Sequence, residues 1–128
     1  WKNWVTGKKG LIGIADSIIE RWFSEKFILS NYEEIQIYKN MLTNTSIEGY
    51  IKCCEAIKNE DLSSTTELIK KPTLVLVGSD DKSTPPAIVK STADLIKNSK
   101  FNIIKDSGHL PCVDSPYKFA KLIKNFIL

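Results

Sequence analysis

A continuous apolar run constrains the fold more than any other feature of the sequence. Residues 73–77 read Thr-Leu-Val-Leu-Val, follow Pro72 and end at Gly78. A run without polar alternation is typical of a strand that is covered on both faces, as in a parallel sheet. The sequence after it predicts a helix near residues 86–96 and then a second short strand over residues 101–105. A crossover helix between the two strands makes them parallel, so we predict an α/β fold with a two-stranded parallel core piece.

Apolar spacing before residue 62 predicts a helical block. Four residues at helical spacing indicate the first helix: Leu11, Ala15, Ile18 and Trp22. Ser30 and Glu33 form a candidate capping box for a second helix that runs through Leu42. Ser46 is the expected cap of a third helix. Residues 63–71 predict one short helix that leads into the apolar strand.

The helices of the second half are predicted with defined buried faces. For the crossover helix, the expected buried stripe is Ile88, Val89, Thr92, Leu95 and Ile96. For the last helix, capped by Ser115 with Pro116 at its first position, the expected stripe is Phe119, Ala120, Ile123 and Ile127.

A two-stranded parallel sheet with apolar faces is not expected to be stable by itself. The strand at residues 74–77 should be central, yet this chain offers it one neighbour. An open strand edge pairs readily with another strand. We therefore expect a homo-oligomer, in which this strand pairs with its copy across a two-fold axis, or a missing N-terminal chain that completes the sheet.

Composition excludes several classes of protein. The net charge is +3, and Arg21 is the only arginine, while the lysines are scattered along the chain. A nucleic-acid binder would concentrate its basic residues, so no nucleic-acid partner is expected. No apolar run approaches the length of a membrane span, and residues 1–9 do not resemble a signal peptide, so no membrane is expected. Three cysteines, two of them adjacent, and one histidine predict neither a disulfide framework nor a metal site, which favours the reducing cytoplasm.

Two loops carry the residue types of hydrolytic chemistry. Residues 78–86 contain the neighbouring carboxylates Asp80 and Asp81, and residues 106–111 contain His109. Each loop follows a predicted parallel strand, so both should lie at the same edge of the sheet, where α/β proteins place their active sites. An acid that orients a histidine is the acid–base half of a catalytic triad. The order of acid and then histidine is the order found in α/β-hydrolases, but no Ser or Cys in the sequence lies in a Gly-x-Ser-x-Gly or Gly-x-Cys-x-Gly elbow.

The sequence resembles the C-terminal part of the 3-oxoadipate enol-lactonase family of α/β-hydrolases. The resemblance runs in order over nearly the whole chain. The stretches that carry it are residues 14–16 (Ile-Ala-Asp), 21–23 (Arg-Trp-Phe), 49–57 (Gly-Tyr-Ile-Lys-Cys-Cys-Glu-Ala-Ile), 61–62, 72–78, 84–86 (Thr-Pro-Pro) and 108–111 (Gly-His-Leu-Pro). The Arg-Trp-Phe and Gly-Tyr-x-x-Cys-Cys pieces are narrower than the rest and point to this family.

The resemblance implies a division of the chain and a set of roles. Residues 1–61 would form a helical cap, and residues 62–128 the C-terminal part of the hydrolase core. Asp81 would be the triad acid, with Asp80 as the competing choice, and His109 would be the base. Trp22 and Arg21 would contact a small lactone or ester. No cofactor and no metal are implied. The nucleophile and oxyanion hole would lie in an N-terminal half that is absent from this sequence, so the chain is expected to be inactive alone.

Alternative interpretations follow from the same residues. His109 could be structural, Trp22 an ordinary core aromatic and Arg21 a solvent-facing side chain. The chain itself could be one part of a split or processed lactone or ester hydrolase. It could also be a degenerate remnant without activity, or a binding module that kept the cap pocket and lost the chemistry.

Overall fold

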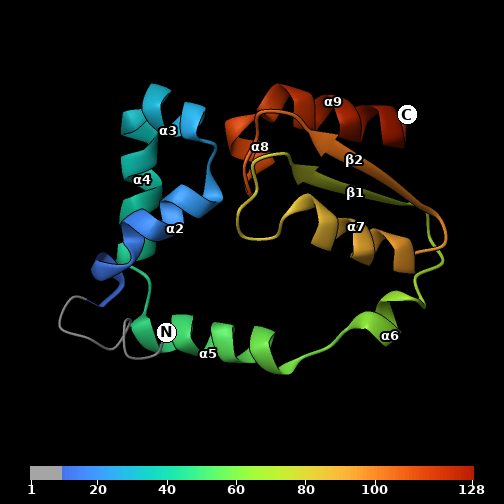
Figure 1. Ribbon diagram of the computed structural model, residues 1–128, viewed down its shortest axis with the longest axis horizontal. Helices are drawn as coiled ribbons and strands as arrows, with labels where there is room; N and C mark the ends of the chain where they lie inside the picture. The colour runs from blue at the N-terminus through green and yellow to red at the C-terminus, as the bar shows by residue number, and fades with distance from the viewer. Residues whose placement is uncertain (1–9) are drawn as a thin grey trace.

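The computed structural model describes residues 10–128 (Figure 1). Residues 10–43 form a helical block, residues 73–127 form a small α/β unit, and the helices of residues 47–66 form an arm that connects the two. The first nine residues of the predicted cap region lie outside the described part. The first half consists of η1 (Gly10–Gly13), α2 (Ala15–Trp22), α3 (Glu25–Ser30), α4 (Tyr32–Thr43), α5 (Ile47–Asn59) and α6 (Ser63–Thr66). The second half consists of β1 (Thr73–Gly78), α7 (Pro86–Leu95), β2 (Ser99–Ile104), α8 (Pro111–Asp114) and α9 (Pro116–Ile127).

The predicted parallel sheet is confirmed. Strands β1 and β2 pair in parallel, in a register that runs from Thr73 opposite Ser99 to Gly78 opposite Ile104. Helix α7 covers one face of the pair and α9 lies over the other face (Figure 1). Because a crossover helix joins the two strands, both end at the same edge of the sheet, and the loops that follow them lie side by side.

The helical block has its own hydrophobic core. Helices α2 and α4 pack together through two clusters of buried residues, Ala15, Ile18 and Leu42 in one and Ile19, Phe23 and Ile35 in the other. Phe23 is fully buried, and its ring contacts those of Phe27 and Tyr38 at centroid distances of 5.4 and 5.2 Å. This aromatic cluster fixes the end of α2, after which the chain continues into α3.

The capping predictions had mixed outcomes. Ser46 caps α5 as predicted, because its Oγ accepts a hydrogen bond from the backbone N–H of Gly49 at 3.3 Å. The predicted capping box at Ser30 and Glu33 is wrong. Ser30 ends the short helix α3, and α4 begins after Asn31. The Asn31 side chain makes no cap hydrogen bond to α4 and instead donates to the Phe27 carbonyl oxygen of α3 at 3.2 Å. The cap that the sequence analysis missed is Ser24, whose Oγ accepts from the N–H of Phe27 at the start of α3.

The buried stripes predicted for α7 and α9 were confirmed only in part. Ile96 is buried as predicted, and Val89, Leu95, Phe119 and Ile123 are partly buried. In α7 the buried residue is Ala93, followed by Ile96 just past the helix, whereas Ile88 is 58% exposed. No residue of α9 is fully buried, and Ile127 is 71% exposed. The reason is the width of the sheet, since two strands cannot cover the apolar faces of two helices. Both helices therefore keep apolar surface that this part of the chain leaves uncovered.

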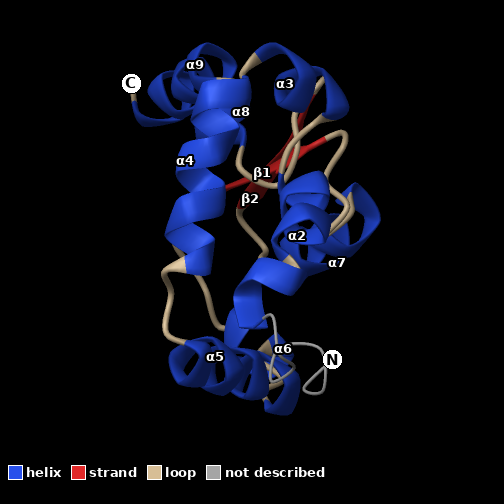
Figure 2. Cartoon of the chain, turned by 90° about the vertical axis from the view of Figure 1, so that its left-hand side faces the viewer, coloured by secondary structure: helices blue, strands red, loops and turns tan. Residues whose placement is uncertain are grey.

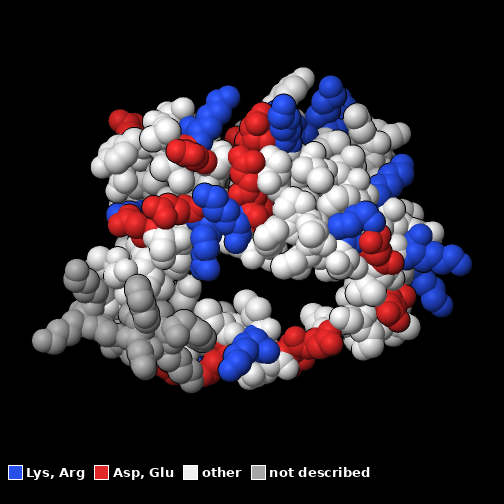
Figure 3. Space-filling model, viewed as in Figure 1, with Lys and Arg blue, Asp and Glu red and all other residues white. Residues whose placement is uncertain are grey.

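An opening passes through the molecule between the connecting arm and the rest (Figure 3). Helices α5 and α6 lie at one end, opposite α3 and α9 (Figure 2), and neither α5 nor α6 contains a buried residue. Within residues 10–128, β1 pairs with β2 alone, so its other edge is unpaired. No helix of the described residues is long and apolar enough to cross a membrane.

Candidate functional site

The loops that follow β1 and β2 are held in direct backbone contact. Gly78 makes this possible, because a Cβ at this position would lie 2.1 Å from the carbonyl oxygen of Gly108 and 2.2 Å from that of Ser107. Beyond Gly78, the Asp80 N–H donates to the Ser107 carbonyl oxygen at 2.8 Å. The Asp106 N–H donates to Ser79 Oγ at 2.9 Å. These contacts leave the two loops little freedom to move apart.

Asp81 and His109 meet between these loops, as the sequence predicted for an acid and a base. Asp81 Oδ2 lies 2.9 Å from His109 Nδ1. The Asp81 side chain is 4% exposed and the His109 ring 33% exposed, so the pair is protected on the acid side and open on the histidine side. This is the geometry of an orienting acid and a histidine that can exchange a proton.

Four hydrogen bonds converge on the Asp81 carboxylate. Its Oδ1 accepts from the backbone N–H groups of Ser83 and Thr84, both at 2.8 Å, and its Oδ2 accepts from Thr84 Oγ1 at 2.9 Å as well as facing His109. Burial raises the pKa of Asp81, but the bonds from His109, Thr84 and Ser83 outweigh burial and hold that pKa below its usual range. Asp81 is therefore ionised at neutral pH.

Thr84 is a part of this site to which the sequence analysis gave no role. Its Oγ1 lies 3.2 Å from His109 Nδ1 and donates its hydroxyl proton to Asp81. Because an ionised carboxylate only accepts hydrogen bonds, Nδ1 must carry the proton, which then lies between Asp81 Oδ2 and Thr84 Oγ1. The other ring nitrogen, Nε2, is left as the base. The signal that could have found Thr84 is its place three residues after the acid, where Asp side chains accept backbone N–H groups in turns.

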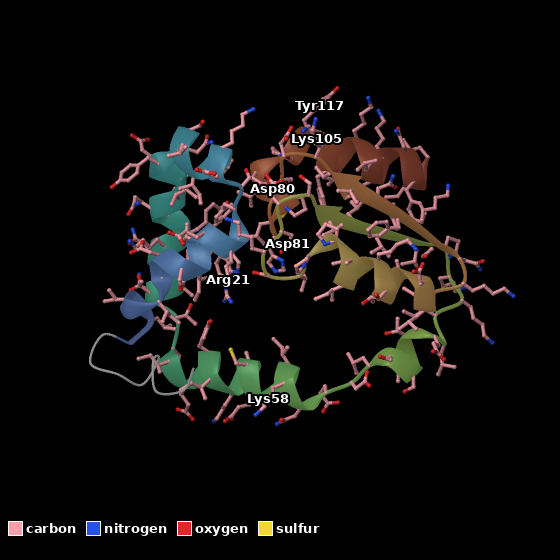
Figure 4. All side chains as sticks on the ribbon, in the orientation of Figure 1. Arg21, Lys58, Asp80, Asp81, Lys105 and Tyr117 are labelled. Carbon is pink, nitrogen blue, oxygen red and sulfur yellow. The ribbon has the colours of Figure 1, made fainter. Side chains whose placement is uncertain are left out.

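Asp80, the competing acid, lies apart from the pair (Figure 4). It is exposed, and its Oδ1 accepts a hydrogen bond from Ser79 Oγ at 2.7 Å. Its backbone N–H donates the hydrogen bond to Ser107 that links the two loops, but its carboxylate makes no hydrogen bond to His109. The structure thus brings His109 together with Asp81 and not with Asp80.

Trp22 contacts the site through its backbone. The Trp22 carbonyl oxygen accepts from the N–H of His109 at 2.7 Å and from that of Leu110 at 3.4 Å. Its half-buried side chain packs against both hydrophobic clusters of the helical block. The side chain is therefore a core aromatic in this structure, while its carbonyl holds the histidine loop.

Arg21 is exposed and extends from α2 towards the opening beside the Asp81 loop (Figure 4). It lies near Tyr50 on α5. Burial and the neighbouring Cys54 raise the pKa of Tyr50, and the positive charge of Arg21 opposes that rise. Arg21 thus places a positive charge at the margin of the opening.

The serines of the two loops do not act as partners of His109. Ser79 Oγ donates to Asp80, and Ser107 Oγ donates to Asp114. Ser83 Oγ is buried and has no hydrogen-bond partner within the described residues. The structure therefore contains an acid and a base in contact, with no serine of these loops hydrogen-bonded to the base.

Comparisons with known proteins agree with this geometry. Residues 30–116, more than half of the chain, match the family described as the alpha/beta hydrolase fold. The chain is 30% identical over 118 residues to 3-oxoadipate enol-lactonase 1 of Acinetobacter baylyi, covering 92% of this chain and 44% of that protein. It is 31% identical over 117 residues to 3-oxoadipate enol-lactonase 2 of the same organism, covering 91% of this chain and 43% of that protein.

Solved structures show the same similarity in three dimensions. The crystal structure of the enol-lactonase from Burkholderia xenovorans superposes with a TM-score of 0.88 at 27% identity, covering 94% of this chain and 46% of that one. A thermophilic esterase from Thermogutta terrifontis superposes with a TM-score of 0.83 at 28% identity, covering 94% of this chain and 44% of that one. This chain thus spans less than half the length of these relatives. Its sequence and fold correspond to a C-terminal part of theirs, and the chain belongs to the α/β-hydrolase family.

Proposed function

We propose that this chain supplies the acid and the base of a carboxylic-ester or lactone hydrolase. The observation that carries the proposal is the contact of Asp81 Oδ2 with His109 Nδ1 at 2.9 Å, on loops that follow parallel strands. Asp81 holds the imidazole with Nδ1 protonated and stabilises the positive charge that the ring gains during the reaction.

The reaction is acyl transfer in two steps. A serine oxygen bonds to the carbonyl carbon of the substrate while His109 Nε2 takes the serine proton. The ester or lactone C–O bond then breaks, and His109 returns the proton to the leaving oxygen. In the second step, a water oxygen bonds to the acyl carbon while His109 Nε2 takes a proton from that water. The bond between the acyl carbon and the serine oxygen then breaks, and His109 returns the proton to the serine, which releases the carboxylic acid. Neither step needs a metal or an organic cofactor.

The nucleophile and the oxyanion hole come, in this proposal, from a polypeptide that corresponds to the part of the relatives that this chain does not span. Two features support a separate contribution. The second edge of β1 is unpaired in the described residues, and the opening lies beside the Asp81 loop (Figures 3 and 4). Without the oxyanion hole alone, a hydrolase loses about 3–4 kcal/mol of transition-state stabilisation, so the isolated chain is expected to be inactive.

The proposed substrate is a small lactone or ester. The relatives named above are enol-lactonases and an esterase, and their names supply this class. Arg21 supports a substrate that carries a carboxylate, since its charge faces the opening (Figure 4). The proposed role of Trp22 is to hold the histidine loop through its backbone carbonyl, with α2 setting the position of that carbonyl. All three cysteines, Cys53, Cys54 and Cys112, are free thiols, which supports a cytoplasmic location.

A second candidate function is a non-catalytic protein that dimerises through β1, either as a remnant or as a binding module for a small carboxylate. The open β1 edge favours it, because a second copy could complete the sheet as well as a different chain could. The two candidates differ in one measurable respect, which is whether a serine-bearing partner restores hydrolysis.

The test is hydrolysis of a chromogenic acetate ester by the pure chain, beside the His109→Ala variant. No turnover above buffer is expected from either. The chain is then mixed with the stretch of Acinetobacter baylyi enol-lactonase 1 that precedes its matching region. Turnover is expected on mixing, its loss in His109→Ala and Asp81→Asn, and its retention in the control Asp80→Asn.

Two outcomes contradict parts of the proposal. Turnover by the pure chain that His109→Ala abolishes would mean that the nucleophile lies within these 128 residues. A mixture that forms a complex, yet hydrolyses neither the acetate ester nor an enol-lactone, would favour the non-catalytic candidate.

A further inference from the structure

The backbone at the end of α2 lies in close contact with the loop that carries His109. The Trp22 carbonyl accepts the His109 N–H, and the next residues of the helical block pass directly over Gly108. A Cβ on Gly108 would lie 2.5 Å from the Trp22 oxygen and 2.8 Å from the Cα of Phe23. Gly108 is thus pressed between the Trp22–Phe23 backbone and Gly78, and His109 follows it directly.

The carboxylate of Asp114 accepts hydrogen bonds from both of these segments, the one after α2 and the one before His109. Asp114 is the last residue of α8. Its Oδ2 accepts from the N–H of Gly108 at 2.6 Å and from the N–H of Ser24 at 3.4 Å, and its Oδ1 accepts from Ser107 Oγ at 2.5 Å. Ser24 and Ser107 are 2% and 0% exposed, so these bonds are shielded from water. A buried donor that loses its acceptor is left unsatisfied, which makes this contact sensitive to a change at Asp114.

We propose that Asp114 is a positioning residue that sets the orientation of the His109 ring. The inference rests on the proposed function, because it concerns the same acid–base pair. The backbone of His109 is fixed by Trp22, and the two residues before it are fixed by Asp114. The direction in which the ring leaves the backbone, and hence its contact with Asp81, follows from these two anchors.

This role differs from that of a carboxylate that only stabilises the fold. A merely structural Asp114 would lower the free energy of unfolding when changed, but leave the His109 ring as it is in the folded molecules. A positioning Asp114 changes the ring in molecules that remain folded. The protein offers a direct readout, because His109 is its only histidine and gives the only imidazole signals.

The experiment is nitrogen-15 NMR of the ring, at a pH where it is neutral, in the wild-type chain and in Asp114→Asn. In the wild type the Nδ1–H tautomer should predominate, because the Asp81 carboxylate accepts at Nδ1. Asp114→Asn removes the negative charge from the acceptor and replaces one carboxylate oxygen with an amide nitrogen that can only donate, so the hydrogen bonds from Gly108, Ser24 and Ser107 are weakened. The ratio of the Nδ1–H to the Nε2–H form should fall about fivefold, the effect of weakening one net hydrogen bond. The matched control is Asp94→Asn, an exposed carboxylate on α7 that pairs with Lys90, and it should leave the ratio unchanged.

The outcomes separate this inference from the proposed function. A wild-type ring mainly in the Nε2–H form would contradict the acid–base pair itself. A wild-type ring in the Nδ1–H form, with an unchanged ratio in folded Asp114→Asn, would overturn the positioning role alone. Ser107→Ala removes only one of the three donors to Asp114 and should destabilise the fold less. It therefore tests the positioning role if Asp114→Asn does not fold. A smaller fall of the ratio supports the role, and no change contradicts it.

Discussion

Gly78 is the residue whose missing side chain allows the two site loops to touch, and Gly108 likewise allows the Trp22–Phe23 backbone to approach the histidine loop. A Cβ at Gly78 would lie within 2.5 Å of three backbone atoms of residues 107 and 108, none of which can rotate away. We expect Gly78→Ala to lower the free energy of unfolding by about 1–3 kcal/mol or more, the usual cost of overpacking. Urea unfolding at neutral pH measures this.

The control for this change is Gly49→Ala on α5. A Cβ there would meet Ser46 Cβ at 3.6 Å, which is an ordinary contact. Alanine within a helix is favoured over glycine by about 0.5–1 kcal/mol, so this variant should be as stable as the wild type or more stable. Equal losses in both variants would mean that the close approach of the loops does not set the cost.

Asp81 gives a pH dependence whose sign is fixed by its lowered pKa. A carboxyl group with a lower pKa in the folded state stabilises the fold above the pKa of the unfolded chain, about 3.9, and this contribution is lost as the pH falls through the folded-state pKa. We expect Asp81→Asn to cost about 1.5–3 kcal/mol near pH 5, as for bonds to a charged group. The cost should shrink near pH 2.

Denaturant unfolding at the two pH values tests this prediction. Asp80→Asn is the matched control, because it removes a neighbouring exposed carboxylate and should change the free energy of unfolding by less than about 0.5 kcal/mol. A cost for Asp81→Asn that is the same at both pH values would show that the charge of Asp81 is not what the four hydrogen bonds stabilise.

Helix α5 packs against the helical block through the partly buried Tyr50, which contacts the cluster of Ala15, Ile18 and Leu42. None of its residues is buried, and the opening separates it from the sheet (Figure 3). Its Ser46 cap therefore matters more to the helix than to the whole molecule. We expect Ser46→Ala, which loses about 1 kcal/mol of capping, to accelerate amide hydrogen exchange in α5 and leave β1 unchanged.

Ser91→Ala is the control for this change, because Ser91 is an exposed serine within α7 and not a cap. It should leave the exchange of α5 unaltered. Faster exchange throughout the molecule in Ser46→Ala would mean that α5 unfolds together with the core, against the expectation from its exposure.

The elements that the sequence predicted well are those whose signal is local. The apolar run of β1, Pro116 at the first position of α9 and Ser46 before α5 each act over a few residues, and each was confirmed. The pairing of His109 with an acid could also be predicted, because two parallel strands place the loops that follow them at one edge of the sheet. What could not be predicted depends on contacts between distant segments, such as the bonds of Asp114 to Ser24 and Gly108, or on burial that a two-stranded sheet cannot supply to Ile88.

At the scale of the whole molecule, the feature that most needs a partner is the edge of β1 that no strand of residues 10–128 pairs with. The N–H of Thr73 bonds to Asn98, just before β2, and that of Ser79 bonds to Ile104 of β2. Strand alternation therefore turns the N–H groups of Leu74, Leu76 and Gly78 to the open side. Helices α7 and α9 also carry exposed apolar residues, Ile88 and Ile127 among them. Both proposed occupants, a second copy or a nucleophile-bearing chain, would add a strand here.

We expect the pure chain to associate through this edge at micromolar concentration, with the mass of a dimer in light scattering. Leu76→Pro removes an N–H that points to the open side and keeps the bonds between β1 and β2, so it should weaken association about tenfold. Ile103→Pro is the matched control. Because the Ser99 N–H bonds to Ile96 and not to β1, alternation turns the N–H of Ile103 to the outer side of β2, where proline should leave association unchanged. A monomer at these concentrations that unfolds cooperatively would contradict pairing between copies, and it would leave the edge of β1 to the nucleophile-bearing chain, whose binding Leu76→Pro should then abolish.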